Sequence, residues 1–286
     1  MSDVKIEAED GAAELIDLLH LGRERVIGAW RLGEVIVDPG PSSCLPTLLP
    51  LLEERPPKAI ALTHIHLDHA GATGTLARLF PELEVWVHER GAPHLIDPSK
   101  LLGSAGRLYG AAMEQLWGEV ASVPAERLRV LRGGERLGPF SVAYTPGHAS
   151  HHVSYLHGPT RRAFTGDVAG VRIDGGSVLA PTPPPDIDLR AWRASLELLE
   201  AWRPSSLAVT HFGAYEDVEE QLASLRAHLD QVEGWAEVLD QEGFAAELRA
   251  RVAEGAADGP PSAYAQALPT EQSYQGLQRY LRKRDG

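Results

Sequence analysis

The chain has 286 residues, of which 43% are hydrophobic and 23% charged, as in an ordinary soluble globular protein. Its 27 Lys and Arg residues against 40 Asp and Glu residues give a formal charge of −13, which argues against a protein that mainly binds nucleic-acid phosphates. The single cysteine excludes an internal disulfide, and no apolar run approaches the ~20 residues of a membrane span. Since the first residues lack a signal-peptide pattern, we expect a cytoplasmic protein that binds neither nucleic acid nor membranes.

The first half of the chain alternates short apolar runs, typical of strands, with patterns of helical spacing. Pro and Gly residues separate these segments and set their ends. The predicted strands cover residues 26–40 (two strands around Gly33), 58–64 and 84–89, and the predicted helices cover 45–54, 71–80 and 95–118.

The second half continues this alternation, with a proline-rich loop in its middle. The predicted strands are 140–147, 151–158, 161–167 and 206–213; the loop is 181–188; helices follow at 188–204, 216–254 and 273–286. Asp186 or Asp188 is expected to cap the helix that follows the loop. Alternating strands and helices favour an α/β fold in which helices cover a sheet. We expect a catalytic domain over residues 1–235 and a C-terminal helical extension over 236–286.

A dense group of metal-binding residue types follows the predicted strand 58–64. Three histidines and one aspartate lie within the six residues 64–69. Imidazole and carboxylate groups suit zinc, iron or manganese. Because alternate side chains of an extended stretch diverge, four such groups fit two neighbouring ions better than one.

Other residues of the same types stand at the ends of later strands. His148, Asp167 and His211 each come at or just after the end of an apolar strand, as His64 does. Open α/β sheets place their sites at strand ends. We therefore expect all of these side chains to meet in one cleft.

These motifs together resemble the metallo-β-lactamase superfamily of metallohydrolases. The matching elements are VDPG (37–40), THIHLDHAG (63–71), TPGHAS (145–150), TGD (165–167) and THFG (210–213). The resemblance implies an αββα sandwich and two divalent metal ions, with zinc expected and iron or manganese as alternatives. The implied ligands are His64, His66 and His148 for the first ion, Asp68, His69 and His211 for the second, and Asp167 as a bridge between them.

The expected reaction follows from this chemistry. Two neighbouring ions lower the pKa of water from 15.7 toward about 7 and polarise a carbonyl. We therefore expect a metal-bridging hydroxide to cleave an ester, thioester, lactone or related bond of a small molecule. Asp68 or Asp38 would carry the proton, and by the resemblance Asp38 also orients ligands. His152 and Tyr274 are candidate substrate contacts, the latter on a C-terminal helix that packs near the cleft.

Three other functions compete with hydrolysis. A mononuclear iron dioxygenase acting on a glutathione persulfide would use His64, His148 and Asp167 and leave the second site empty. A phosphodiesterase or nuclease is disfavoured by the charge of −13. A non-catalytic metal-binding protein is disfavoured because three ligands per ion leave positions open for water, as catalytic sites do. In each case we expect a monomer or homodimer.

Overall fold

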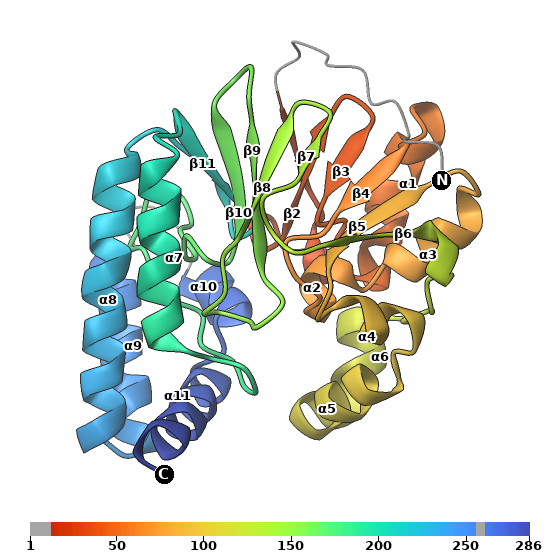
Figure 1. Cartoon of the computed structure of the whole chain (residues 1–286). Helices are drawn as coiled ribbons and strands as arrows, with labels where there is room; N and C mark the ends of the chain where they lie inside the picture. The colour runs from red at the N-terminus through yellow and green to blue at the C-terminus, as the bar shows by residue number, and fades with distance from the viewer. Residues whose placement is uncertain (1–12, 256–260) are drawn as a thin grey trace.

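The computed structural model describes residues 13–255 and 261–286. Two six-stranded sheets face each other in the middle of the molecule, and helices cover the outer face of each sheet (Figure 1). The fold is therefore the αββα sandwich implied by the sequence motifs. Residues 1–12 of the expected catalytic domain lie outside the described part of the chain.

The first sheet contains the N-terminal strands in the order of the chain. They are β1 (Glu14–Asp17), β2 (Gly28–Leu32), β3 (Val35–Val37), β4 (Ala59–Ala61), β5 (Glu84–His88) and β6 (Leu128–Leu131). The pairs β1–β2 and β2–β3 are antiparallel, whereas the pairs β3–β4, β4–β5 and β5–β6 are parallel. Because parallel strands end at the same edge of a sheet, Asp38 after β3 and the segment 62–69 after β4 emerge side by side.

The second sheet is formed by the next six strands, in the order β12-β11-β10-β9-β8-β7. They are β7 (Arg136–Leu137), β8 (Phe140–Tyr144), β9 (Val153–His157), β10 (Arg162–Gly166), β11 (Ser206–Val209) and β12 (Gly213–Tyr215). All neighbours are antiparallel except β10 and β11. That parallel pair delivers Asp167 and His211 to the same edge.

Aromatic side chains fill the space between the sheets. Trp30 of β2 contacts Phe164 of β10, and Trp86 of β5 contacts Phe140 of β8, each pair edge to face with ring centroids 5.9 Å apart. All four side chains are buried. Such packing fixes the two sheets relative to each other and so fixes the loops at their common edge.

The helices lie outside the sheets (Figure 1). They are α1 (Leu45–Glu54), α2 (Leu67–Ala70), α3 (Thr73–Leu79), α4 (Ala92–Ile96), α5 (Ser99–Tyr109), α6 (Met113–Trp117), α7 (Leu189–Ala201), α8 (Val218–Val238), α9 (Gln241–Gly255), α10 (Pro261–Ala267) and α11 (Thr270–Asp285). Short 3-10 turns occur at His20–Gly22, Ser42–Cys44, Gly110–Ala112 and Ala125–Arg127. Along the described residues, no helix combines the length and apolar character needed to cross a bilayer.

Two predicted helical regions are interrupted in the structure. The region 95–118 contains α4, α5 and α6, because Pro98 precedes α5 and Gly110, at a φ of 50°, ends it. The region 216–254 is divided into α8 and α9. The cap of α7 is Asp188, whose Oδ1 accepts a hydrogen bond from the Ala191 N–H at 2.9 Å.

The C-terminal helices pack against the rest of the chain. Helix α11 contacts α8 and α9, and α8 continues across the boundary expected between residues 235 and 236. Gly276 of α11 lies so close to the loop 181–185 that an added Cβ would fall 2.0 Å from the Thr182 carbonyl oxygen. A side chain there would push α11 away from this loop.

Candidate metal centre

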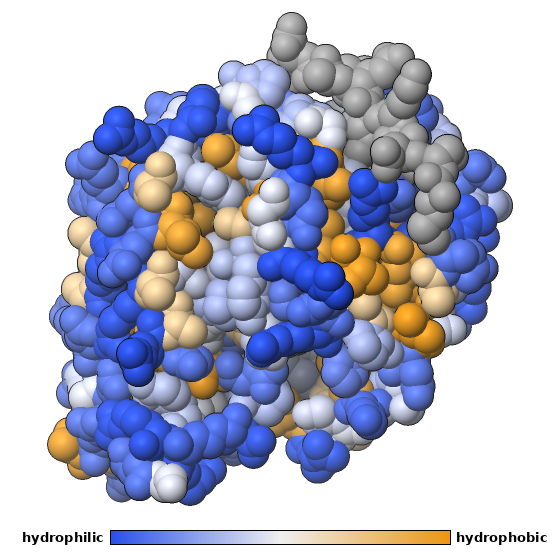
Figure 2. All heavy atoms as spheres, viewed as in Figure 1, coloured by the Kyte–Doolittle hydropathy of each residue, from blue (hydrophilic) through white to orange (hydrophobic). Residues whose placement is uncertain are grey.

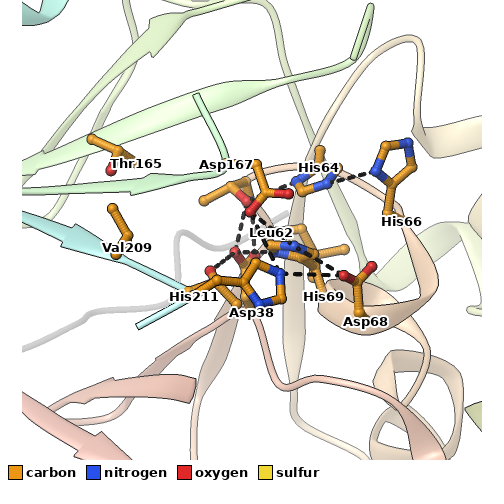
Figure 3. A network of polar contacts seen from close by, with 12 residues as sticks. Asp38, Leu62, His64, His66, Asp68, His69, Thr165, Asp167, Val209 and His211 are labelled. Atoms are coloured by element: carbon orange, nitrogen blue, oxygen red, sulfur yellow. Dashed lines mark hydrogen bonds and ion pairs between the residues drawn. The ribbon is translucent and has the colours of Figure 1, made fainter. Parts of the chain in front are cut away.

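The seven predicted ligands converge at the common edge of the two sheets. Figure 3 shows His64, His66, Asp68 and His69 of the segment after β4 facing Asp167 and His211. His148, from the loop after β8, completes the set. The ligand atoms form three groups, in each of which they lie within 4.8 Å of one another: His64, His66 and His148; His64, His69 and Asp167; Asp68, His69 and His211.

The first group presents three imidazole nitrogens to one point. His66 Nδ1 lies 3.0 Å from Nε2 of both His64 and His148. His148 Nδ1 donates to the Pro181 carbonyl at 2.8 Å, which leaves the lone pair of a neutral His148 on Nε2. Backbone contacts of this kind fix the orientation of a ligand before an ion binds.

The second group contains one carboxylate and two imidazoles. Asp68 Oδ2 lies 3.3 Å from His211 Nε2 and 3.7 Å from His69 Nε2. His211 Nδ1 donates to the Val26 carbonyl at 2.5 Å, so its Nε2 also points to the centre with a free lone pair when neutral.

Asp167 lies between the two groups. Its Oδ2 is 3.4 Å from His148 Nε2 of the first group. Its Oδ1 is 3.3 Å from His69 Nε2 and 3.7 Å from His211 Nε2 of the second. Each carboxylate oxygen therefore faces a different group, which is the arrangement of a bridging ligand.

Unpaired polar atoms at the centre fit bound cations. His69 Nε2, His211 Nε2 and Asp167 Oδ1 are buried and have no hydrogen-bond partner in the described part of the chain. Buried polar atoms without partners are costly and rare. Nitrogen and carboxylate donors without thiolates suit zinc, iron or manganese, so the residues fit a pair of such ions.

The electrostatics of the two groups differ. Burial, reinforced by the neighbouring histidines, holds the pKa of His64 well below its usual value, and burial lowers the pKa of His66 to about 4. These imidazoles are neutral at pH 7, as metal ligands must be. Burial opposes protonation of His69 and His211 too. Asp167 and Asp68 nevertheless raise the pKa of both residues, and Asp38 raises that of His69 further. The second group therefore attracts positive charge more strongly than the first.

Asp38 holds ligands and does not line the cavity of the site. It is completely buried, and its Oδ1 accepts from the Thr63 N–H at 2.8 Å. Its Oδ2 accepts from the Thr63 hydroxyl at 2.6 Å, from His69 Nδ1 at 2.8 Å and from the Thr210 hydroxyl at 3.2 Å. These contacts match the expected orienting role. They do not support the proton-carrying role, because Asp38 has no open face toward a substrate.

The two candidate substrate residues also lie away from the cavity. His152 is buried behind His64, with ring centroids 5.1 Å apart, and its Nδ1 pairs with the Thr145 hydroxyl at 3.0 Å. Tyr274 packs on Phe244 and donates to the Leu239 carbonyl at 3.3 Å. Neither residue lines the cavity, so the structure gives no support for direct substrate contact, which stays a prediction for both. His152 supports a ligand, and Tyr274 anchors α11.

A cavity of about 320 Å³ opens beside the ligands, with His66, Asp68 and Asp167 in its wall. Its other walls come from α5, α6, the loop 181–185, α10 and the start of α11. Tyr109 and Gln272 face each other across it, the Tyr109 hydroxyl donating to Gln272 Oε1 at 3.2 Å. Sequence analysis did not identify these residues as part of the site, because segments far apart in the chain form the walls.

Comparison with known proteins agrees with this geometry. The family model described as the metallo-beta-lactamase superfamily matches residues 33–211, which contain all seven ligands. A metallo-beta-lactamase fold-containing protein of Sulfurisphaera tokodaii is 32% identical over 161 residues, which are 54% of this chain and 60% of that protein. A hydroxyacylglutathione hydrolase of Salmonella paratyphi A is 33% identical over 138 residues, 46% of this chain and 41% of the enzyme. The chain thus matches about half the length of these relatives.

Solved structures extend the likeness over more of the chain. An archaeal metallo-beta-lactamase superfamily protein from Sulfolobus tokodaii superimposes with a TM-score of 0.70 at 23% identity, covering 93% of this chain and 97% of the other, which shows a shared fold. The di-iron-bound form of TTHA1623 gives a TM-score of 0.56 at 28% identity, covering 70% of this chain and 93% of the other.

Proposed function

Because the chain belongs to the metallo-β-lactamase superfamily, we propose that it is a metal-dependent hydrolase that cleaves an ester, thioester, lactone or related bond of a small molecule. The observation that carries this proposal is the position of Asp167, whose two carboxylate oxygens face two separate ligand groups beside a cavity. A hydroxyacylglutathione hydrolase among the relatives supports hydrolysis as the reaction class.

The proposed cofactor is a pair of divalent ions, with zinc as the expected metal and iron or manganese as alternatives. His64, His66 and His148 would hold one ion, Asp68, His69 and His211 the other, and Asp167 both. When bound, the ions supply a hydroxide nucleophile near neutral pH and polarise the scissile carbonyl. The two ligand groups support this pair.

Asp68 is the carboxylate best placed to accept a proton. Its side chain is 22% exposed and lines the cavity, whereas that of Asp167 is 5% exposed and that of Asp38 is completely buried. Burial would raise the pKa of Asp68, but His69 and His211 outweigh it and hold the pKa below its usual range. Asp68 is therefore ionised at pH 7, and we propose that it orients the attacking water and takes its proton.

Two features support a small-molecule substrate. The cavity suits a small molecule, and the charge of −13 disfavours nucleic acid. We propose a cytoplasmic monomer or homodimer that binds no membrane, and a catalytic domain over residues 1–235 with a C-terminal extension over 236–286 that completes the cavity wall.

The test combines metal analysis of the purified protein with a panel of one ester, one lactone and one thioester. We expect two equivalents of metal and turnover of at least one substrate class. One equivalent of iron with oxygen uptake on a glutathione persulfide would replace the hydrolase with the dioxygenase. Two bound metals without any turnover would favour a metal-binding protein. An Asp167→Asn variant is the control for turnover by a contaminating esterase.

A further inference from the structure

The cavity beside the ligands has a predominantly apolar wall. Helix α5 contributes Leu101, Ser104, Ala105 and Leu108, which follow the spacing of one helix face. Trp117 of α6 adds a large apolar surface. The face of the molecule in Figure 2 is mostly hydrophilic, with some hydrophobic groups, in contrast to the predominantly apolar lining of the cavity.

The proline-rich loop in the opposite wall adds no backbone hydrogen-bond donors to the cavity. Pro181, Pro183, Pro184 and Pro185 line the cavity, and proline has no backbone N–H. The Pro181 carbonyl is already engaged by His148, and the Pro185 carbonyl accepts from Arg279 Nε at 3.0 Å. This loop therefore offers nothing that would bind a carboxylate or a phosphate.

Charged partners for an anion are also missing from the cavity. Among the described residues that line it, none is Lys or Arg, and the two charged ones are the carboxylates Asp68 and Asp167. Arg284, near the end of α11, instead pairs with Glu233 and Glu237 on α8. The neutral polar side chains largely satisfy one another, as in the contact between Tyr109 and Gln272.

We propose that this cavity binds the uncharged, apolar acyl group of a small ester, thioester or lactone, and that it rejects acyl or thiol groups that carry a carboxylate or phosphate, glutathione thioesters included. This inference rests on the proposed hydrolase function and narrows its substrate class. A volume of about 320 Å³ is roughly twice that of a cavity that accepts benzene, which suits a short alkyl chain or a single ring beside the scissile bond. An anionic group in the apolar part of the cavity, away from the metal ligands, would lose its hydration without gaining a partner.

The test compares two substrates that differ in one group. In p-nitrophenyl pentanoate the acyl chain ends in a methyl group, and in mono-p-nitrophenyl glutarate a carboxylate replaces that methyl. With the metal-loaded protein we expect kcat/KM for the pentanoate to exceed that for the glutarate by at least about a hundredfold, because the buried carboxylate remains unpaired. Equal kcat/KM values for the two esters, or a higher value for the glutarate, would overturn the inference. A higher kcat/KM for a butanoyl-glutathione thioester than for a butanoyl thiophenol ester would also overturn it.

A matched pair of variants ties the preference to the cavity wall. Leu108→Arg places a cation among the lining residues, whereas Leu102→Arg places one on the same helix at a half-buried position outside the lining. We expect Leu108→Arg to reduce the pentanoate-to-glutarate ratio at least about tenfold and Leu102→Arg to leave it unchanged. An equal change in both variants, or a change in neither, would contradict the assignment of this wall.

Binding of a molecule that cannot be hydrolysed separates this inference from the proposed function. Pentyl phenyl ketone is uncharged and has no leaving group, and its binding is measured by calorimetry. If the ketone binds, if Leu108→Arg weakens this binding, and if no ester is turned over, the apolar cavity is supported and the hydrolase function is refuted. If charged esters are turned over and the ketone does not bind, the hydrolase function is supported and the apolar cavity is refuted.

Discussion

Asp167 is the residue on which the proposed centre depends most. Its oxygens face both ligand groups, whereas Asp68 and His69 each belong to the second ion. We expect Asp167→Ala to lower kcat/KM further than Asp68→Ala or His69→Ala, and to reduce the bound metal from two equivalents toward none. Activity assays beside elemental analysis of the three variants measure this. Unchanged metal content in Asp167→Ala would contradict the bridging role.

Asp38 acts through the residues it holds. Its Oδ2 accepts from His69 Nδ1, so Asp38→Asn places an amide nitrogen or a weaker acceptor against that imidazole. We expect the affinity for the second ion to fall about 10- to 100-fold, since outer partners of metal ligands have effects of this size. The affinity for the first ion should fall less, because Asp38 reaches its ligand His64 only through the Thr63 hydroxyl. Stepwise zinc titration against a chelating dye resolves the two events. Equal loss at both sites would show a general folding defect instead.

Zinc binding should release protons at pH 7. The carboxylates raise the pKa of both His69 and His211, that of His69 well above its ordinary value, so His69 carries a proton at pH 7 in the absence of metal and must lose it on binding. We expect about one to two protons to be released per protein, from His69 and from the protonated fraction of His211. His64 and His66 release none, because their lowered pKa leaves them neutral. Calorimetric titrations in buffers of different ionisation enthalpy count these protons. Release of none would show that the carboxylates do not control the second site.

Residue types and spacing were enough to predict which side chains come together, because imidazoles and carboxylates at strand ends have few other reasons to occur together. The positions of His152 and Tyr274, away from the cavity, could not be predicted in the same way. Strand β9 begins at Val153, and its pleat determines the direction in which His152 faces. The packing of α11 determines that Gln272 and Ser273, rather than Tyr274, reach the cavity. A single sequence does not contain these orientations.

At the scale of elements, α8 holds the loop that leads to the cavity. His228 of α8 accepts a hydrogen bond from the Ala180 N–H at 2.9 Å, directly before the proline-rich segment. Burial, with Arg251 nearby, lowers the pKa of His228 to about 3. The folded protein therefore requires the neutral imidazole.

This lowered pKa gives His228 a defined effect on stability. The stabilisation is complete above the unfolded value of about 6.5 and is lost as the pH falls toward 3, because the unfolded chain takes up the proton first. The free energy of unfolding should fall by up to about 1.4 kcal/mol per pH unit across this window. In His228→Asn, which keeps an acceptor but cannot be protonated, urea unfolding at pH 7, 6, 5 and 4 should show a smaller slope. Parallel slopes in the two proteins would contradict this role.

The predicted helical regions lie where the sequence placed them, but two of them, 95–118 and 216–254, are divided into separate helices. Residues 95–118 have helical spacing throughout, yet Pro98 and Gly110 divide them, and the turn lets α5 present its apolar face to the cavity. The apolar stripe was visible in the sequence. The stripe lines a cavity rather than a core because the loop 181–185 and α11 lie opposite it. Only tertiary packing determines the positions of these two segments.

At the scale of the whole molecule, we expect the fold to persist without metal. Aromatic packing between the sheets and the helices outside them form the core, and a chain of this length buries roughly three-quarters of its unfolded surface. We expect chelation to abolish hydrolysis while circular dichroism remains unchanged, and zinc to restore the activity. Global unfolding on chelation would make the ions structural.

The central claim is that two ions share Asp167, and anomalous diffraction from crystals of the zinc-loaded protein, recorded at the zinc edge, tests it most directly. The account predicts two peaks about 3.5–4 Å apart, one beside His64, His66 and His148 and the other beside Asp68, His69 and His211, with Asp167 in contact with both. A single fully occupied peak, or two peaks of which Asp167 contacts one, would contradict it.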